Sequence, residues 1–233
     1  MRNFLVVLML CCLLSPLLAD EGGRDSETNT KASGRIEAAG TVLDEIQNAP
    51  DNRIPEEILG SAECVAVVPS LLNGGFVFGG RYGRGVASCR TAKGWSAPAF
   101  FMIGGGSFGL QIGGQATDVV MLIMNKGGMD HLLSSKFKLG GDASAAAGPV
   151  GRHAAADTDW KMRAQVLTYS RSRGLFAGLE LNGAVIKQDK DSTRDFYGRM
   201  VPFKTSLTGE VEAPKGAYPF LSTLAKWAQS ASK

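Results

Sequence analysis

The sequence predicts an α+β protein built on a strongly curved, mainly antiparallel sheet, or a partly closed barrel, flanked by helices. Short β-branched and aromatic runs alternate with glycine-containing turns along the middle of the chain, which is typical of such sheets. Apolar residues at helical spacing precede and follow these runs. Glycine makes up 30 of the 233 residues without any repeat, which indicates tight turns, bulges and close backbone contacts.

Four segments are expected along the chain. Residues 1–19 form a signal peptide and residues 20–33 form a disordered, polar linker. Residues 34–198 form one domain without an internal boundary. Residues 199–233 form a C-terminal extension that carries an amphipathic helix around Phe220 and Trp227.

The N-terminus has the pattern of a secretory leader. Arg2 precedes the apolar run Phe4–Leu14, and the small residue Ala19 marks the expected cleavage point. The run is short for a bilayer span. A retained anchor, or a lipoprotein modified at Cys11 or Cys12, is the alternative. We therefore expect an exported protein, periplasmic or extracellular, with association to the envelope as a further option.

Two cysteines, Cys64 and Cys89, remain once the leader is removed. In an oxidising compartment we expect them to form a disulfide. The alternative is a pair of buried thiols on neighbouring strands. Their spacing is not that of a zinc site, so no metal is expected.

Helix boundaries are marked by capping residues and prolines. A first helix is expected from Ser33 to Pro50, and a second between Pro55 and Gly60. Asn125 is expected to cap a helix, and Asp189–Tyr197 reads as a short helix. The expected strands are Cys64–Val68, Phe76–Gly80, Gly85–Arg90, Ala97–Ile103, Leu110–Ile112, Val119–Met124, Ala164–Tyr169, Leu175–Leu181 and Ala184–Lys187, with Asn182–Gly183 as a hairpin turn.

No set of residues suited to catalysis is assembled in the sequence. Residues 104–109 match a dinucleotide fingerprint, but the required helix does not follow them. Ser135 and Lys138 match a Ser-x-x-Lys spacing without its companion motifs. His131 and His153 are the only histidines. We expect neither enzyme activity nor a cofactor.

Basic residues in or near glycine-rich turns are the candidate ligand contacts. A guanidinium group beside backbone N–H groups suits phosphate, such as that of a lipid head group. The spacing alone favours the alternative, that these residues are solvated loop charges. The formal net charge of +3 is too small to favour a nucleic-acid binder. The candidates are Arg81, Arg84, Lys136, Lys138, Arg152, Arg171 and Arg173.

A membrane-binding helix is a second candidate. Lys31–Gln47 has an apolar face and a basic start, as interfacial helices do, but Glu37, Asp44 and Glu45 weaken attraction to anionic lipid. The alternative is that this helix packs on its own sheet.

Several ordered motifs between residues 35 and 198 resemble the SYLF family. They are Ala66–Ser70, Gly79–Gly85, Trp95–Phe100, Gly106–Gln115, Lys138–Ala143, Ala147–Arg152 and Tyr169–Gly178. The resemblance implies lipid binding, since eukaryotic members bind phosphoinositides, and yeast members also bind actin.

The resemblance and the leader together give the expected function. We expect a non-catalytic protein that binds anionic phospholipid or phosphoinositide-like head groups at the bacterial envelope. The alternative is a structural module that binds another envelope protein. Nucleic acid is not an expected partner, and actin is an unlikely one for an exported chain.

Overall fold

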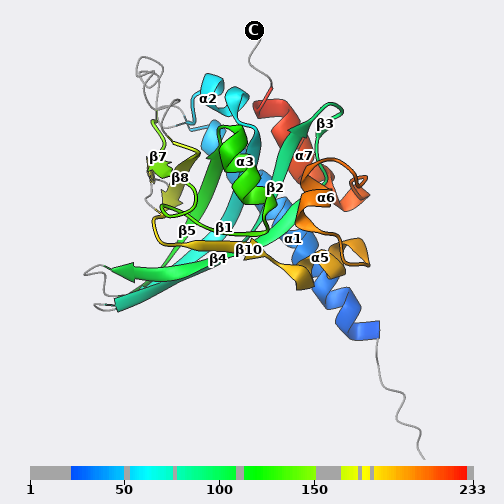
Figure 1. Ribbon diagram of the computed structural model, residues 1–233. Coiled ribbons are helices and arrows are strands. Elements are labelled where there is room, and N and C mark those ends of the chain that lie inside the picture. Colours follow the sequence, from blue (N-terminus) through cyan, green and yellow to red (C-terminus); the bar gives the residue numbers. More distant parts are fainter. Residues whose placement is uncertain are drawn as a thin grey trace, which may run out of the picture.

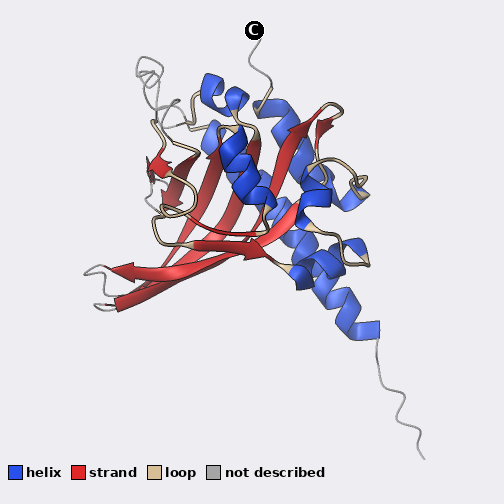
Figure 2. Ribbon diagram, viewed as in Figure 1, coloured by secondary structure: helices blue, strands red, loops and turns tan. Residues whose placement is uncertain are grey.

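The computed structural model describes residues 22–49, 53–75, 78–108, 113–150, 164–172, 175–178 and 181–229. These residues form one strongly curled sheet with helices packed against it (Figures 1 and 2). The strands are β1 (Cys64–Gly75), β2 (Phe78–Thr91), β3 (Gly94–Trp95), β4 (Ala99–Phe108), β5 (Gly113–Ile123), β6 (Lys136–Lys138), β7 (Ala145–Ala147), β8 (Val166–Ser172), β9 (Leu175–Gly178) and β10 (Val185–Gln188). The helices are α1 (Gly22–Gln47), α2 (Glu56–Ser61), α3 (Lys126–Leu133), α5 (Lys190–Tyr197), α6 (Phe203–Leu207), the 3₁₀ turn η2 (Lys215–Ala217) and α7 (Tyr218–Trp227).

The sheet order is β6-β10-β4-β2-β1-β5-β8-β7, with β3 on β2 and β9 on β8. Every pairing is antiparallel except that of β7 with β8. The predicted α+β class with a curved, mainly antiparallel sheet is therefore confirmed.

Each face of the sheet has its own apolar core, because alternate strand residues point to opposite sides. On one face, Val86 and Phe100 pack with Ile36 and Leu43 of α1. We call this the α1 face. On the opposite face, the inner face, the core includes Cys64, Ala66, Ala87, Cys89, Phe101, Ile103, Leu132, Phe137, Ile186, Phe203 and Leu207.

Local capping signals are found where the sequence places them. The Asn125 side chain accepts a hydrogen bond from the backbone N of Gly128 at the start of α3. Asp189 caps α5 by accepting from the backbone N of Ser192, and Gly198 ends that helix with φ 66°. These boundaries depend on one or two residues and their immediate neighbours, so they are readable without tertiary information.

Helix α1 begins at Gly22, whereas the sequence favoured a disordered linker up to residue 33. The segment is poor in large apolar residues, which is why no helix was expected. Extending a helix that is already nucleated adds one hydrogen bond per residue without a further nucleation cost. The packed part of α1 therefore provides a template for its polar N-terminal part.

The Asn182–Gly183 turn exists, but the hairpin prediction is wrong. The backbone N of Ala184 donates to Leu181 O, which closes the turn. The strands on either side do not pair with each other: β9 pairs with β8, and β10 lies between β4 and β6. The expected strand Leu110–Ile112 lies outside the described residues.

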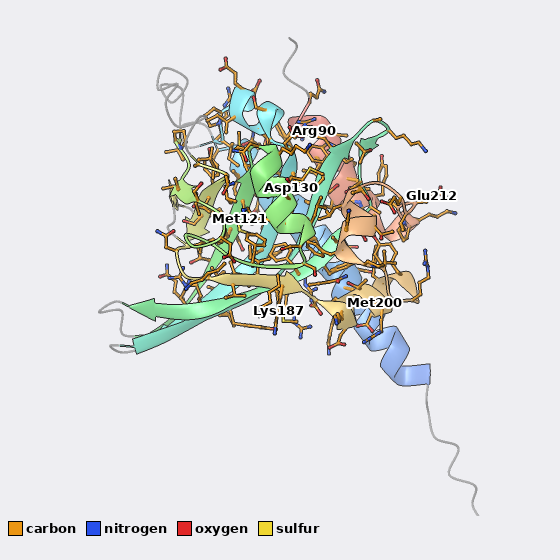
Figure 3. The ribbon with its side chains drawn as sticks, in the orientation of Figure 1. Arg90, Met121, Asp130, Lys187, Met200 and Glu212 are labelled. Atoms are coloured by element: carbon orange, nitrogen blue, oxygen red, sulfur yellow. A yellow bond between two sulfur atoms is a disulfide. The ribbon has the colours of Figure 1, made fainter. Side chains whose placement is uncertain are left out.

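Arg90 ties the C-terminal helix α7 to the rest of the domain. Its guanidinium donates to Ala62 O at 2.8 Å and to Ala228 O at 2.6 Å, just beyond the ends of α2 and α7. The same group lies 4.6 Å from the Trp95 ring centroid. In the core, Phe220 of α7 packs with residues of α1, so α7 is part of the fold (Figures 1 and 3).

Gly85 in β2 is a position where a side chain does not fit. An added Cβ would lie 2.5 Å from Val67 O and 2.5 Å from Phe101 Cζ. We expect Gly85→Ala to lower the free energy of unfolding by about 2 kcal/mol, since overpacking against backbone cannot relax through a rotamer change. Urea denaturation measures this. Gly80 is the matched control in the same strand, because a Cβ there meets nothing within 4 Å. Equal losses for both variants would show that strand propensity, and not the close approach, sets the cost.

Candidate functional site

Three of the predicted basic residues, together with Lys187, lie on one face of the sheet. The strand register pairs Arg84 with Met102, Met102 with Lys187, and Lys187 with Lys136. Because Val86 and Phe100 define the α1 face, Arg84 and Met102 two residues away share it. Figure 3 shows Lys187 on the side of β10 that is turned away from α3.

The next row of the same face adds apolar side chains and glycine. The register pairs Lys138 with Val185, Val185 with Gly104, Gly104 with Tyr82, and Tyr82 with Leu72. The exposed fractions of Leu72 and Tyr82 are 56% and 46%, which is high for large apolar side chains. We define the basic patch as Leu72, Tyr82, Arg84, Lys136, Lys138 and Lys187.

Arg84 is held in place by a buried carboxylate. Its Nε donates to the Tyr82 hydroxyl at 2.8 Å, and its Nη1 lies 3.7 Å from Asp189 Oδ2. The hydrogen bond to Tyr82 raises the pKa of Arg84, and the Asp189 charge acts in the same direction.

Asp189 is fully buried and joins three elements. Besides Arg84 of β2, it faces Nη1 of Arg35 on α1 at 3.5 Å and accepts from the Ser192 hydroxyl of α5 at 2.8 Å. The Ser192 hydroxyl in turn accepts from Arg35 Nη1 at 2.9 Å. Burial lowers the pKa of Arg35, although the Asp189 charge opposes this shift. The cluster fixes Arg84 relative to the helices.

The remaining candidates do not join this patch. Arg81 lies two residues before Gly83 in β2, so both positions face the same side of the sheet. A Cβ at Gly83 would meet Val68 and Leu71 of the inner-face core, and Arg81 therefore lies on the inner face. Arg171 forms ion pairs with Glu45 of α1 and with Asp118, the latter at 3.4 Å, so its charge is already neutralised. Arg152 and Arg173 lie outside the described residues.

Sequence reasoning missed Lys187. The signal was present in the burial pattern expected for Val185–Gln188, where the buried Ile186 lies between two residues that face the other way. Only the pairing of β10 with β6 shows that Lys187 stands beside Lys136.

The apolar face of α1 is used inside the protein. Ile36, Leu43 and Ile46 are completely buried, and Val42 is nearly so. The alternative that Lys31–Gln47 packs on its own sheet is thus the observed one. No helix in the described residues is both long enough and apolar enough to cross a membrane.

The glycine motif at 104–109 does not have the geometry of a nucleotide loop. Residues 104–108 continue strand β4, and the next described element is strand β5 at Gly113. A nucleotide fingerprint needs a helix N-terminus at that point. Within the described residues, no group of His, Cys, Asp and Glu side chains is placed to hold a metal ion.

Comparison with known proteins gives the family. Residues 104–227 match the family model Ysc84, described as "Las17-binding protein actin regulator". The chain belongs to this family. An SH3 domain-containing protein of Schizosaccharomyces pombe is 37% identical over 175 residues, which is 73% of this chain and 40% of the relative. The resemblance to the SYLF family noted in the motifs is thereby confirmed.

Relatives from other eukaryotes match at similar levels. LAS seventeen-binding protein 3 of Saccharomyces cerevisiae is 33% identical over 205 residues, covering 86% of this chain and 44% of the relative. SH3 domain-containing YSC84-like protein 1 of Mus musculus is 33% identical over 173 residues, covering 73% of this chain and 51% of the relative. The chain thus spans between two fifths and about half of the relatives' length.

The expectation about partners is wrong. Actin was judged an unlikely partner and a membrane surface the main one, yet the family is described as an actin regulator and relatives are named for binding Las17. That expectation rested on the leader at residues 1–19, since an exported chain would not meet actin. The names of the family and of its relatives indicate binding proteins and describe no enzyme.

Proposed function

We propose that this chain is a non-catalytic binding protein that recognises a protein of an actin-regulating assembly. The observation that carries the proposal is the gathering of Arg84, Lys136, Lys138 and Lys187 on one face beyond the helices. Cations concentrated on one face steer and orient an acidic partner. The description of the family and the name of its yeast relative support an actin-regulating partner.

From the sequence, the expected ligand is a lipid head group, and two features of the molecule argue against that expectation. The apolar residues Ile36, Leu43 and Ile46 of α1 are buried, so they are not available to a bilayer. The predicted head-group residue Arg171 is occupied by Glu45 and Asp118. Binding of a protein partner requires neither an exposed apolar face on α1 nor an unpaired Arg171.

The test compares purified partners directly. We expect the purified chain to bind immobilised Las17 or to co-sediment with actin filaments, with an affinity that falls as salt rises. Flotation with phosphatidylserine-containing and with pure phosphatidylcholine vesicles is the parallel arm. Binding to anionic vesicles, with no retention by Las17 or actin filaments, would overturn the proposal in favour of lipid.

A further inference from the structure

We infer that the basic patch docks an acidic segment of a protein partner, with one carboxylate on Arg84 and an apolar side chain on Leu72 and Tyr82. The inference rests on the proposed function and adds the surface and the chemistry of the partner. The register that builds the patch joins strands from distant parts of the chain.

The lysines of the patch lack carboxylate partners. Lys136, Lys138 and Lys187 are all exposed, and none forms an ion pair with a carboxylate in the part of the chain that the structure describes. The nearby carboxylate of Asp142 accepts from the backbone N of Lys138. An acidic partner would therefore meet positive charge that the protein itself does not neutralise.

Arg84 is a positioned cation among exposed lysines. Its Nε is engaged by Tyr82 and its Nη1 faces Asp189, while 43% of its side chain remains exposed. A guanidinium that is already held loses less conformational entropy when it binds a carboxylate. Arg84 thus sets where the acidic group of the partner lies.

Open space beside Tyr82 suits an apolar anchor. A Cβ added at Gly74, Gly80 or Gly106 would meet nothing within 4 Å, so among the described residues no side chain covers these three positions. A groove of about 550 Å³ runs here, and Leu72, Gly74, Gly80, Tyr82 and Ala116 are among the residues that line it. Exposed aromatic and aliphatic side chains next to cations are typical of interface centres.

The partner segment lies over the face and does not extend the sheet at β6. Most outward-facing backbone groups of this edge strand are already bonded. Lys136 O accepts from the Ser134 hydroxyl, Lys138 N donates to Asp142 Oδ2, and Lys138 O accepts from Asp142 N. Strand addition needs free backbone groups at the edge. The side chains of the patch are what remains available for recognition.

Charge reversal with a matched control tests the surface. The probe is a fluorescent peptide of alternating Glu and Leu with one Tyr, compared with the same peptide carrying Gln for Glu. We expect Lys136→Glu/Lys138→Glu/Lys187→Glu to weaken binding of the acidic peptide at least about tenfold and to flatten its salt dependence. The control, Lys93→Glu/Lys126→Glu/Lys215→Glu, changes the net charge equally at exposed positions and should stay within about twofold.

The geometry of Arg84 is tested by a change that keeps its charge. Arg84→Lys should weaken binding of the acidic peptide about fivefold, because one ammonium group cannot contact Tyr82 and Asp189 and also hold the peptide carboxylate in the same geometry. Binding of the Gln peptide should be unaffected. Equal losses for the patch and control triple variants would overturn the inference, as would patch-dependent binding of phosphatidylserine vesicles without peptide binding. If Las17 or actin binds the wild-type chain and the patch variant equally well, the inference fails while the proposed function stands.

Discussion

Replacing Asp189 with alanine is expected to lower the free energy of unfolding by about 4 kcal/mol, the range for removing one member of a buried ion pair. The carboxylate is fully buried between Arg35, Arg84 and Ser192. Without it, the largely buried guanidinium of Arg35 keeps its desolvation cost and loses its counter-charge. The hydrogen bond from the backbone N of Ser192 that caps α5 is lost as well, and its loss accounts for about 1 kcal/mol of the expected total. Urea denaturation measures the change.

A carboxylate on the same helix provides the control. Asp191 is exposed and pairs with Arg194 at 3.4 Å on the surface, so Asp191→Ala should change stability by less than about 0.5 kcal/mol. The double change Arg35→Met/Asp189→Ala should cost less than Asp189→Ala alone, because it removes the orphaned charge. If Asp189→Ala were no more costly than Asp191→Ala, the buried cluster would not contribute to the fold.

The same cluster connects stability to recognition. Arg84 reaches the surface from a position set by Asp189, so Asp189→Asn should loosen Arg84 while keeping the helix cap. Such a variant still removes the counter-charge of Arg35, so it should lose stability, but less than Asp189→Ala because the cap is kept. The folded fraction should bind the acidic peptide more weakly.

Local signals explain what the sequence predicted well. The caps at Asn125 and Asp189 and the stop at Gly198 depend on side chains within a few residues of the helix end. Short β-branched and aromatic runs between glycine-containing turns likewise indicated most of the strands. Helix caps, helix ends and strand positions are each set by a short continuous stretch of residues, and so they can be predicted from the sequence.

The pairing register between strands that are distant in the chain could not be predicted from the sequence. Arg84, Lys187 and Lys136 come together only because β10 enters the sheet between β4 and β6. The Asn182–Gly183 turn suggested a hairpin with the preceding strand, but the tertiary pairing of β10 overrode that local preference. Candidate residues chosen by their own sequence neighbours therefore separate: Arg84, Lys136 and Lys138 lie together, whereas Arg171 is neutralised by Glu45 and Asp118.

The disulfide between Cys64 and Cys89 carries the other large expected effect. Both residues are fully buried and directly opposite each other on β1 and β2. The bridge closes a loop with a sequence separation of 25, for which loop entropy gives a stabilisation of about 3 kcal/mol. We expect Cys64→Ala/Cys89→Ala to lose that amount in urea denaturation. The strand pairing itself should survive, because the register of β1 with β2 continues on both sides of a bulge.

The thiols also test export, which remains a prediction. Disulfides persist in oxidising compartments and are rare in the cytosol, so protein alkylated directly in its source cells should show no free thiol at Cys64 or Cys89 after denaturation. Reduction of the denatured protein before alkylation is the control and should expose both. Labelling without reduction would mean that the chain resides where thiols stay reduced. In that case the leader at residues 1–19 would not be acting as an export signal, and the chain would share a compartment with cytosolic partners. Full oxidation would instead require a partner that meets the protein after export.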